Sequence, residues 1–229
     1  INQAEHPPML RAAVLSLLVV QLAAIPTSLT TSKVPVSVYV ESLCPDCQNF
    51  IATTMTDVFN AEGVMDIIDF KLYPFGNAKV DSQGTITCQH GEEECKGNIV
   101  ETCVVHHFPN VSQYFPFVQC FEADGGYAIH AERCANEAGL DYTVINKCMS
   151  SDEGHKLELQ VAKDTPADHQ WVPWVVVSGD ALQPMSENDK LLKLVCDKYA
   201  AMGGTKPPGC STEVGPNVNP APFPRCLNE

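Results

Sequence analysis

The sequence predicts an α/β fold, and three stretches near the start of the folded part predict it. Val34 to Val40 is apolar and β-branched, as is typical of a strand buried on both faces. Gln48 to Ala61 carries apolar residues at helical spacing and is followed by Gly63, a residue type that often ends helices. Val64 to Tyr73 again has strand character. Together these stretches predict a β-α-β unit.

A second sheet-forming region follows much later in the chain. Trp171 to Asp180 has strand character, and its last two residues are typical of a hairpin turn. Ala181 to Pro184 would be a short partner strand. Ser186 is expected to cap a final helix, Glu187 to Ala201, whose apolar residues share one face. This region therefore predicts a β-β-α unit.

The two units are separated by a cysteine-rich, mostly helical segment at about residues 77–168. The order β-α-β, helical segment, β-β-α is the layout of a thioredoxin-like fold with a helical insertion, which we place at residues 33–204. Residues 205–229 are rich in proline and are predicted to be a poorly ordered tail, pinned by Cys210 or Cys226.

The first 32 residues are predicted to be removed from the mature protein. Met9-Leu10-Arg11 and the apolar run Ala12 to Ala24 have the pattern of a secretory signal peptide, with a buried helix as the alternative. We expect translation to start at Met9 and cleavage to fall between Ala24 and Ser32. The apolar run is too short to span a membrane, and no other segment is apolar enough, so we expect a soluble product.

The composition of the chain limits which cellular compartments and which binding partners are expected. The chain has 229 residues, enough for one domain with an insertion, and its 11 cysteines indicate an oxidising compartment. A formal net charge of −14 argues against nucleic acid or an anionic membrane as a partner.

The chemistry is expected at Cys44-Pro45-Asp46-Cys47, where the first strand meets the first helix. One helical turn separates the two cysteines, which is within reach of a disulfide. The helix N-terminus would favour the thiolate of the first cysteine, and Pro45 suits the first helical position. Cys44 and Cys47 are therefore candidates for thiol–disulfide exchange. Half of a zinc site and an inert structural bridge remain alternatives on spacing alone.

A second cysteine cluster runs from Cys88 to Cys103. If Cys95 and Cys103 share one helix, their Cα atoms lie about 12 Å apart, too far for a disulfide, so each needs another partner. Cys88 could fold back on one of them. Zinc binding by Cys88, His90, Cys95 and Cys103 is conceivable, but a secreted, cysteine-rich chain favours disulfides, and His90 would then form hydrogen bonds in a loop.

This cluster resembles the C-Q-H-G-x2-E-C-x2-N-x4-C signature of the gamma-interferon-inducible lysosomal thiol reductase (GILT) family. The matching residues are Cys88, Gln89, His90, Gly91, Glu94, Cys95, Asn98 and Cys103. His169 to Trp174 looks like the family's cis-proline segment, and the resemblance covers roughly residues 34–210. It implies a thioredoxin-like enzyme that reduces protein disulfides at acidic pH in a lysosome-like compartment. The proline between the two cysteines resembles the plant members, which hints at a vacuole or the extracellular space.

From these residues we expect Cys44 to attack a substrate disulfide and Cys47 to resolve the mixed disulfide, while Val172 and Pro173 align the substrate strand. Asp46 would oppose the thiolate unless it is protonated or solvated. The expected partners are disulfide-bonded proteins and a small-thiol or protein reductant, with no cofactor and no metal. An inert disulfide-rich binding protein, or an oxidase or isomerase, would use the same residues.

Two further expectations concern single side chains. Asn110-Val111-Ser112 is an N-glycosylation sequon, so Asn110 is a candidate for glycosylation. Without Cys44 and Cys47, nine cysteines remain, so one must be a free thiol or join another molecule, and Cys226 is the candidate.

Overall fold

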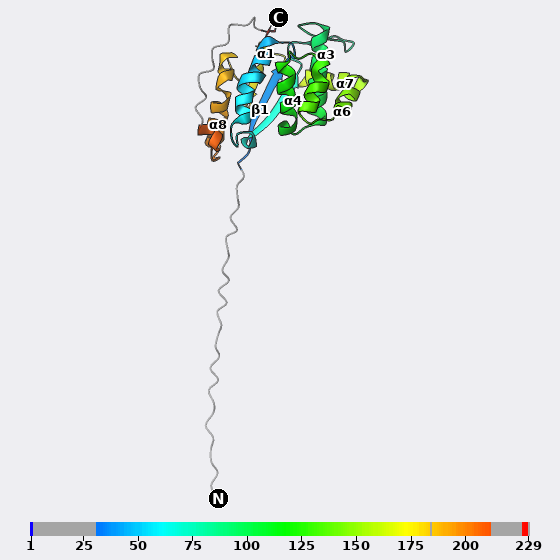
Figure 1. Ribbon diagram of the computed structural model, residues 1–229. Helices are drawn as coiled ribbons and strands as arrows, with labels where there is room; N and C mark the ends of the chain where they lie inside the picture. The colour runs from blue at the N-terminus through cyan, green and yellow to red at the C-terminus, as the bar shows by residue number, and fades with distance from the viewer. Residues whose placement is uncertain (2–30, 184, 212–225, 229) are drawn as a thin grey trace. The chain divides into compact units, whose positions relative to one another are not determined.

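The computed structural model describes residues 1, 31–183, 185–211 and 226–228 (Figure 1). Its main sheet has the strand order β2-β1-β6-β7. β1 (Val34–Val40) runs parallel to β2 (Ile68–Pro74) and antiparallel to β6 (Trp174–Val177), and β7 (Asp180–Ala181) pairs antiparallel with β6. Because β1 lies between two strands and buries most of its side chains, its sequence is apolar nearly throughout. The predicted α/β class is confirmed, and β1 has the predicted bounds.

The helical run after β1 begins at Pro45, as expected for that proline, and so includes residues before the apolar stretch Gln48 to Ala61. It consists of α1 (Pro45–Phe50), a π-helical turn (Ile51–Met55) and α2 (Thr56–Asn60). Cys44 is the N-cap of α1, and Pro45 takes the first helical position, where a missing N–H is tolerated. Gly63 follows with a φ of +73°, a conformation that favours glycine, so the predicted end of the helix is confirmed.

The second strand starts later than predicted. Residues 65–67 form a 3₁₀ turn (Met65–Ile67), and β2 begins only at Ile68. Ile67 and Ile68 are both buried, so their apolar character does not distinguish the turn from the strand.

The segment between the two halves is helical as predicted, but it begins with a hairpin that the sequence did not indicate. β3 (Lys79–Val80) and β4 (Ile86–Thr87) pair antiparallel. Helices follow: α3 (Glu92–His107), α4 (Val111–Ala123), a 3₁₀ turn (Ala128–His130), α5 (Ala131–Glu137), α6 (Tyr142–Met149) and α7 (Asp152–Asp164). Figure 1 shows α3, α6 and α7 grouped on one side of the molecule and α8 on the other.

Three disulfides fasten this insertion. Cys88 folds back to Cys95, Cys103 on α3 joins Cys148 on α6, and Cys120 on α4 joins Cys134 on α5. As helix geometry predicts, the two cysteines of α3 bond elsewhere and not to each other. The insertion is also continuous with the core, because α4 buries three phenylalanines in the cluster that contains β1: Phe115, Phe117 and Phe121.

The second half of the sheet begins with β5 (Trp171–Val172) and a cis peptide bond between Val172 and Pro173, which confirms the predicted cis-proline. The hairpin between β6 and β7 turns one residue earlier than predicted. Its two loop residues, Ser178 and Gly179, have φ values of 54° and 89°, as a tight two-residue hairpin requires.

The last helix also differs from the prediction. A 3₁₀ segment (Met185–Lys190) precedes α8 (Leu191–Ala201), so Ser186 lies inside that segment and does not cap α8. A further 3₁₀ turn (Pro208–Ser211) is joined to α8 by the Cys196–Cys210 disulfide, and β8 (Cys226–Leu227) pairs antiparallel with β5. Both cysteines expected to pin the tail are bonded, because Cys226 forms a disulfide with Cys44.

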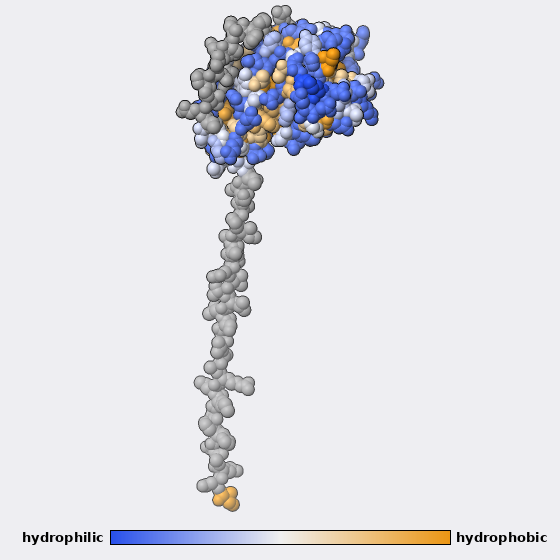
Figure 2. All heavy atoms as spheres, viewed as in Figure 1, coloured by the Kyte–Doolittle hydropathy of each residue, from blue (hydrophilic) through white to orange (hydrophobic). Residues whose placement is uncertain are grey.

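Several predictions lie outside the described residues: the start at Met9, the signal peptide up to Ala24, and the strand end at Pro184. The same holds for residues 212–225 of the tail. Within the described part, no helix combines the length and apolarity needed to cross a membrane. The face shown in Figure 2 is mainly hydrophilic, with hydrophobic residues in small separate groups.

Candidate active site

Cys44 lies where β1 ends and α1 begins, as the sequence predicts. The backbone N–H of Cys47 points to Cys44 Sγ at a distance of 3.5 Å. The partial positive charge of the helix N-terminus acts on the same sulfur atom. Both effects stabilise a thiolate, which is the reactive form of a nucleophilic cysteine.

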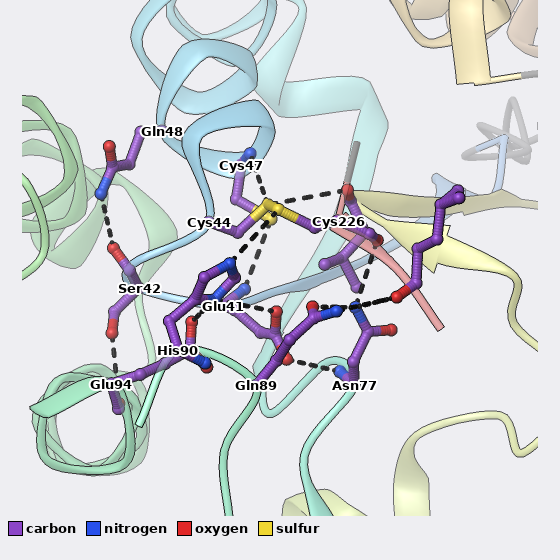
Figure 3. The surroundings of a disulfide bond; sticks show 12 residues. Glu41, Ser42, Cys44, Cys47, Gln48, Asn77, Gln89, His90, Glu94 and Cys226 are labelled. Atoms are coloured by element: carbon purple, nitrogen blue, oxygen red, sulfur yellow. Dashed lines mark hydrogen bonds and ion pairs between the residues drawn. A yellow bond between two sulfur atoms is a disulfide. The ribbon is translucent and has the colours of Figure 1, made fainter. Parts of the chain in front are cut away.

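Cys44 is bonded to Cys226, and Cys47 is the free cysteine of the described residues (Figure 3). The expected bridge between Cys44 and Cys47 is therefore corrected. The physical reason is the pairing of β8 with β5, which carries Cys226 to within 6.2 Å of Cys44, measured between Cα atoms. Since the other eight cysteines form four bridges, Cys226 is the odd one, as predicted, but it is not free.

The bond between Cys44 and Cys226 is enclosed. Cys44 and Cys47 are 0% exposed and Cys226 is 2% exposed. The carbonyl oxygen of Val172, just before the cis bond, lies 3.8 Å from Cys44 Sγ. The structure thus brings Cys44, Cys47, Val172 and Pro173 together, as the sequence analysis expected.

The signature residues support the loop that leads into Cys44. Asn98 Oδ1 accepts a hydrogen bond from the backbone N–H of Ser42 (2.9 Å), and Ser42 Oγ donates to the carbonyl oxygen of Glu94 (3.2 Å). The Cys88–Cys95 bond closes the turn at Gly91, which has a φ of +93° and lies directly before α3. The signature therefore holds α3 against the residues before the nucleophile.

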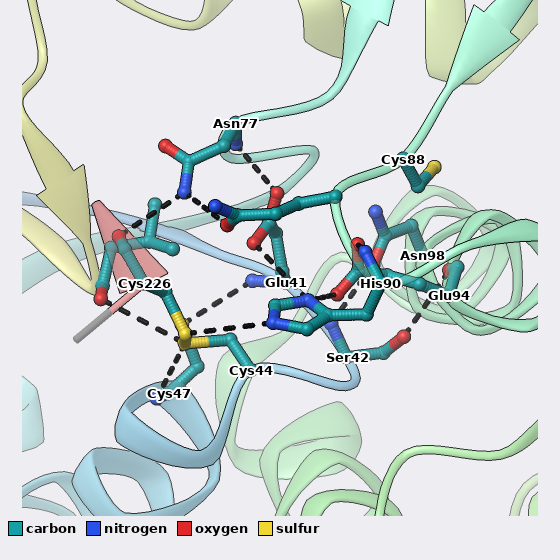
Figure 4. A network of polar contacts seen from close by, with 12 residues as sticks. Glu41, Ser42, Cys44, Cys47, Asn77, Cys88, His90, Glu94, Asn98 and Cys226 are labelled. Atoms are coloured by element: carbon teal, nitrogen blue, oxygen red, sulfur yellow. Dashed lines mark hydrogen bonds and ion pairs between the residues drawn. A yellow bond between two sulfur atoms is a disulfide. The ribbon is translucent and has the colours of Figure 1, made fainter. Parts of the chain in front are cut away.

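His90 connects this loop to the sulfur atoms (Figure 4). Its Nε2 lies 4.0 Å from Cys226 Sγ, and its Nδ1 lies 2.5 Å from Glu94 Oε2. Glu41 Oε2 is 3.9 Å from the same Nδ1. His90 therefore has a larger role than the loop hydrogen bonds expected for it, because it faces the disulfide directly.

Glu41 is a site residue that the sequence analysis missed. Its side chain is buried, and it accepts a hydrogen bond from the backbone N–H of Asn77 (2.7 Å). Burial, followed by the charge of Glu94, raises the pKa of Glu41 to about 8. The only available signal was its place between the strand and the Cys-x-x-Cys stretch.

The surroundings of Cys47 keep its thiol protonated. Burial raises the pKa of Cys47 well above its usual value, and the charges of Glu122, Glu41 and Asp46 add to this. The backbone N–H of Glu41, 3.4 Å from Cys47 Sγ, acts in the opposite direction. Asp46 thus opposes a thiolate, as predicted, but it does so at Cys47.

Three more buried glutamates lie in the helical insertion: Glu101, Glu122 and Glu158. Burial raises the pKa of Glu101 and of Glu158 to about 8. Burial also raises the pKa of Glu122, and the charge of Glu101 adds to the effect. No role is predicted for these residues from the sequence, because charged side chains usually lie at the surface.

The zinc alternative for Cys88, His90, Cys95 and Cys103 does not hold, because its three cysteines form the disulfides that the sequence favoured, Cys88–Cys95 and Cys103–Cys148. Among the described residues, two other groups have donor atoms close enough for a metal ion: Glu41 with His90 and Glu94, and His106 with His107 and Glu153. In the first group, Glu94 already contacts His90 Nδ1.

Two remaining candidates lie away from the sulfur atoms. His169 is buried, and its Nε2 lies 3.0 Å from Asn77 Oδ1, so it helps to order the loop beside β8. Asn110 is exposed and caps α4 by accepting a hydrogen bond from the backbone N–H of Ser112. Its glycosylation stays a prediction.

Comparison with known proteins gives consistent matches. Residues 35–138 match the family model described as gamma interferon inducible lysosomal thiol reductase (GILT). A gamma-interferon-responsive lysosomal thiol protein of Arabidopsis thaliana is 35% identical over 195 residues, which cover 83% of this chain and 81% of the relative. A gamma-interferon-inducible lysosomal thiol reductase of Carassius auratus is 37% identical over 199 residues, covering 82% and 76%.

Solved structures show the same fold at low sequence identity. The reduced form of the disulfide bond oxidoreductase DsbG from Mycobacterium tuberculosis has a TM-score of 0.54 at 19% identity, covering 78% of this chain and 84% of that chain. Reduced DsbA from the same organism has a TM-score of 0.52 at 20% identity, covering 81% and 90%. The thioredoxin-like architecture predicted from the order of elements is thereby confirmed.

Proposed function

Since this chain belongs to the gamma-interferon-inducible lysosomal thiol reductase family, we propose that it reduces disulfide bonds of proteins through Cys44 and Cys47. The observation that carries the proposal is the position of Cys44. It caps the N-terminus of α1, its sulfur faces the residue before a cis-proline, and it is joined to a peptide in extended conformation. A sulfur in this position can exchange disulfides with an extended peptide.

The proposed reaction has two exchange steps. The Cys44 thiolate attacks one sulfur of a substrate disulfide, the substrate S–S bond breaks, and the other substrate sulfur leaves as a thiolate and takes up a proton. Cys47 loses its proton and attacks Cys44 Sγ, which releases the second substrate thiol and forms a Cys44–Cys47 bridge. The enzyme has then given two electrons and two protons to its substrate. A small thiol or a protein dithiol reduces the bridge and is itself oxidised.

The burial of Cys47 supports its role as the resolving cysteine. Its raised pKa keeps it protonated, so it does not compete with Cys44 for the first attack. Cys44 has the more favourable position for a thiolate, because both the N–H of Cys47 and the helix N-terminus stabilise negative charge there.

We further propose that the enzyme works at acidic pH. Glu41 and Glu122 are neutral well above the usual range of a carboxyl group, and both raise the pKa of Cys47 when they are charged. Ionisation of Glu41 around pH 8 adds negative charge beside the sulfurs and disfavours any thiolate there. This effect predicts a decline of activity from about pH 8 upward, and the acidic setting itself is proposed because the relatives include lysosomal thiol reductases. We propose that the protein acts in a lysosome, in a vacuole or in the extracellular space. The five disulfides support an oxidising compartment of this kind.

The test is reduction of a denatured, disulfide-bonded protein with a small thiol as electron donor, from about pH 4 to about pH 8. We expect activity that is highest on the acidic side and is lost in Cys44→Ser. Cys196→Ser with Cys210→Ser is the matched control, since it removes a disulfide that contains neither site cysteine; per folded molecule it should keep the activity. Full activity in Cys44→Ser would contradict the assigned roles. Activity only near neutral pH would contradict the acidic setting, and no activity at any pH would favour an inert bridge.

A further inference from the structure

The C-terminal strand occupies the position in front of Cys44 that a reacting peptide would need. β8 pairs antiparallel with β5, with Cys226 opposite Val172 and Leu227 opposite Trp171. The N–H of Asn228 donates to the carbonyl oxygen of Gln170 (3.0 Å) and continues the pairing. The strand therefore lies along the segment that leads into the cis-proline.

The contacts to this strand are mainly contacts to its backbone (Figure 3). Gln89 Nε2 donates to the carbonyl oxygen of Leu227 (2.9 Å), and Asn77 Nδ2 donates to that of Cys226 (3.1 Å). The side chain of Leu227, in contrast, is exposed. Backbone recognition of this kind suits a strand that takes the place of many different peptides.

The bond also shields the nucleophile. Cys44 and Cys226 are both almost completely buried, so neither a protein disulfide nor a bulky thiol can reach Cys44 while the strand is in place. Cys47, which holds the free thiol of the described residues, lies beside the bond (Figure 3). The three cysteines that remain after the four other bridges are therefore gathered at one site.

We propose that Cys226 is a third exchanging cysteine of the reductase and that the C-terminal strand is a tethered substitute for substrate. This inference rests on the proposed function. In the exchange, Cys47 loses its proton and attacks Cys44 Sγ, the Cys44–Cys226 bond breaks, a Cys44–Cys47 bond forms, and Cys226 leaves as a thiolate that takes up the proton. The reverse exchange re-forms the Cys44–Cys226 bond, so that β8 covers Cys44 again; we call β8 with this bond the cap. Neither direction changes the net oxidation state.

His90 is placed to assist the departure of Cys226. Its Nε2 lies 4.0 Å from Cys226 Sγ, so a protonated imidazole can stabilise the leaving thiolate. Glu94 and Glu41 face the other ring nitrogen, and Asp46 and Glu122 are the further acidic groups whose charge acts on Cys47. After a substrate has been reduced, Cys226 can capture the oxidised site and keep a new substrate strand out until a small thiol opens the cap.

The first test maps the bond in the full chain. The protein is oxidised with glutathione disulfide, quenched with acid to stop exchange, alkylated with N-ethylmaleimide and digested without reduction for mass spectrometry. We expect alkylation at Cys47 and a linked pair of peptides that contain Cys44 and Cys226. In Cys47→Ser, which cannot reopen the cap by exchange, the same linkage should persist. Alkylation at Cys226 and a Cys44–Cys47 linkage, with no detectable linkage between Cys44 and Cys226, would overturn the proposal.

The second test measures how the cap delays turnover. Oxidised protein is mixed with substrate and a limiting small thiol, and its initial rate is divided by the rate of the same variant after full prior reduction. We expect this ratio to be at least about fivefold lower in the wild type than in Cys226→Ser, because the buried bond resists attack. Leu227→Ala, which alters an exposed side chain of the same strand, should behave as the wild type does.

The two tests separate failure of this inference from failure of the proposed function. Equal ratios in wild type and Cys226→Ser would contradict the cap even if the reduced enzyme is active. A fully reduced wild type without reductase activity would instead contradict the proposed function, and the mapping would still decide whether Cys226 bonds to Cys44.

Discussion

Replacing Glu158 with glutamine should flatten the dependence of stability on pH. Glu158 on α7 is 1% exposed and accepts a hydrogen bond of 2.6 Å from Thr102 Oγ1 on α3. Burial raises its pKa to about 8; the hydrogen bond from Thr102 opposes this rise, and the charge of Glu101 adds to it. Glutamine keeps an acceptor for Thr102 but cannot ionise.

The magnitude follows from proton linkage. Between about pH 5 and about pH 8 the carboxyl group is ionised in the unfolded chain and protonated in the folded protein. The folded state therefore binds more protons, and the free energy of unfolding decreases as pH rises. The stabilisation is complete below the unfolded pKa and is lost as pH approaches the folded pKa. At about 1.4 kcal/mol per pH unit, Glu158 contributes at most about 4 kcal/mol over this range.

The assay is urea unfolding with the disulfides intact at several pH values from about 5 to about 8. Over that range, we expect the free energy of unfolding of the wild type to fall by about 2–4 kcal/mol more than that of Glu158→Gln, after allowance for local relaxation around the charge. Glu132→Gln makes the same chemical change at an exposed position and should retain the wild-type decline. Parallel curves for wild type and Glu158→Gln would refute the reasoning.

Two further predictions concern the support of the site and of the insertion. Gly126 has a φ of +70°, and a Cβ there would lie 1.8 Å from the carbonyl oxygen of Ser42. Gly126→Ala should therefore lower the free energy of unfolding by at least about 2 kcal/mol. It should also lower reductase activity, because it moves the loop before Cys44. Urea unfolding and the reductase assay check this, and an active variant of unchanged stability would contradict it. The Cys103–Cys148 bond spans 45 residues. Replacing both cysteines with serine should lower the free energy of unfolding by about 4 kcal/mol in the same experiment. A loss below about 1 kcal/mol would show that the bond adds little.

Much of the fold was predictable because local patterns and long-range structure agree. β1 has the predicted bounds, Cys88 folds back to Cys95, and the bond before Pro173 is cis. A β-branched run predicts β1, and a helix that keeps Cys95 and Cys103 apart requires another partner for each of them, which leaves Cys88 as a neighbour in the preceding loop. The cis bond, in contrast, is expected from the order of the elements and from the family resemblance, because a proline at the start of a strand is by itself usually trans.

The parts that were missed depend on contacts far apart in the chain. Cys44 and Cys226 are separated by 182 residues, and the two-residue strands that bring them together have no recognisable pattern in the sequence. The buried glutamates were missed for another reason. A glutamate on a helix normally faces water, and only the packing of α3, α4 and α7 shows that Glu101, Glu122 and Glu158 do not.

The identity of the cysteine that captures a substrate tests the central claim most directly. The double variant Cys47→Ser with Cys226→Ser lacks both thiols that could resolve a mixed disulfide with Cys44. After incubation with a disulfide-bonded substrate and alkylation, peptide mapping should find the substrate linked to Cys44. A substrate linked to another cysteine, or no linked substrate while Cys44 is free and the protein is folded, would contradict the claim that Cys44 is the nucleophile.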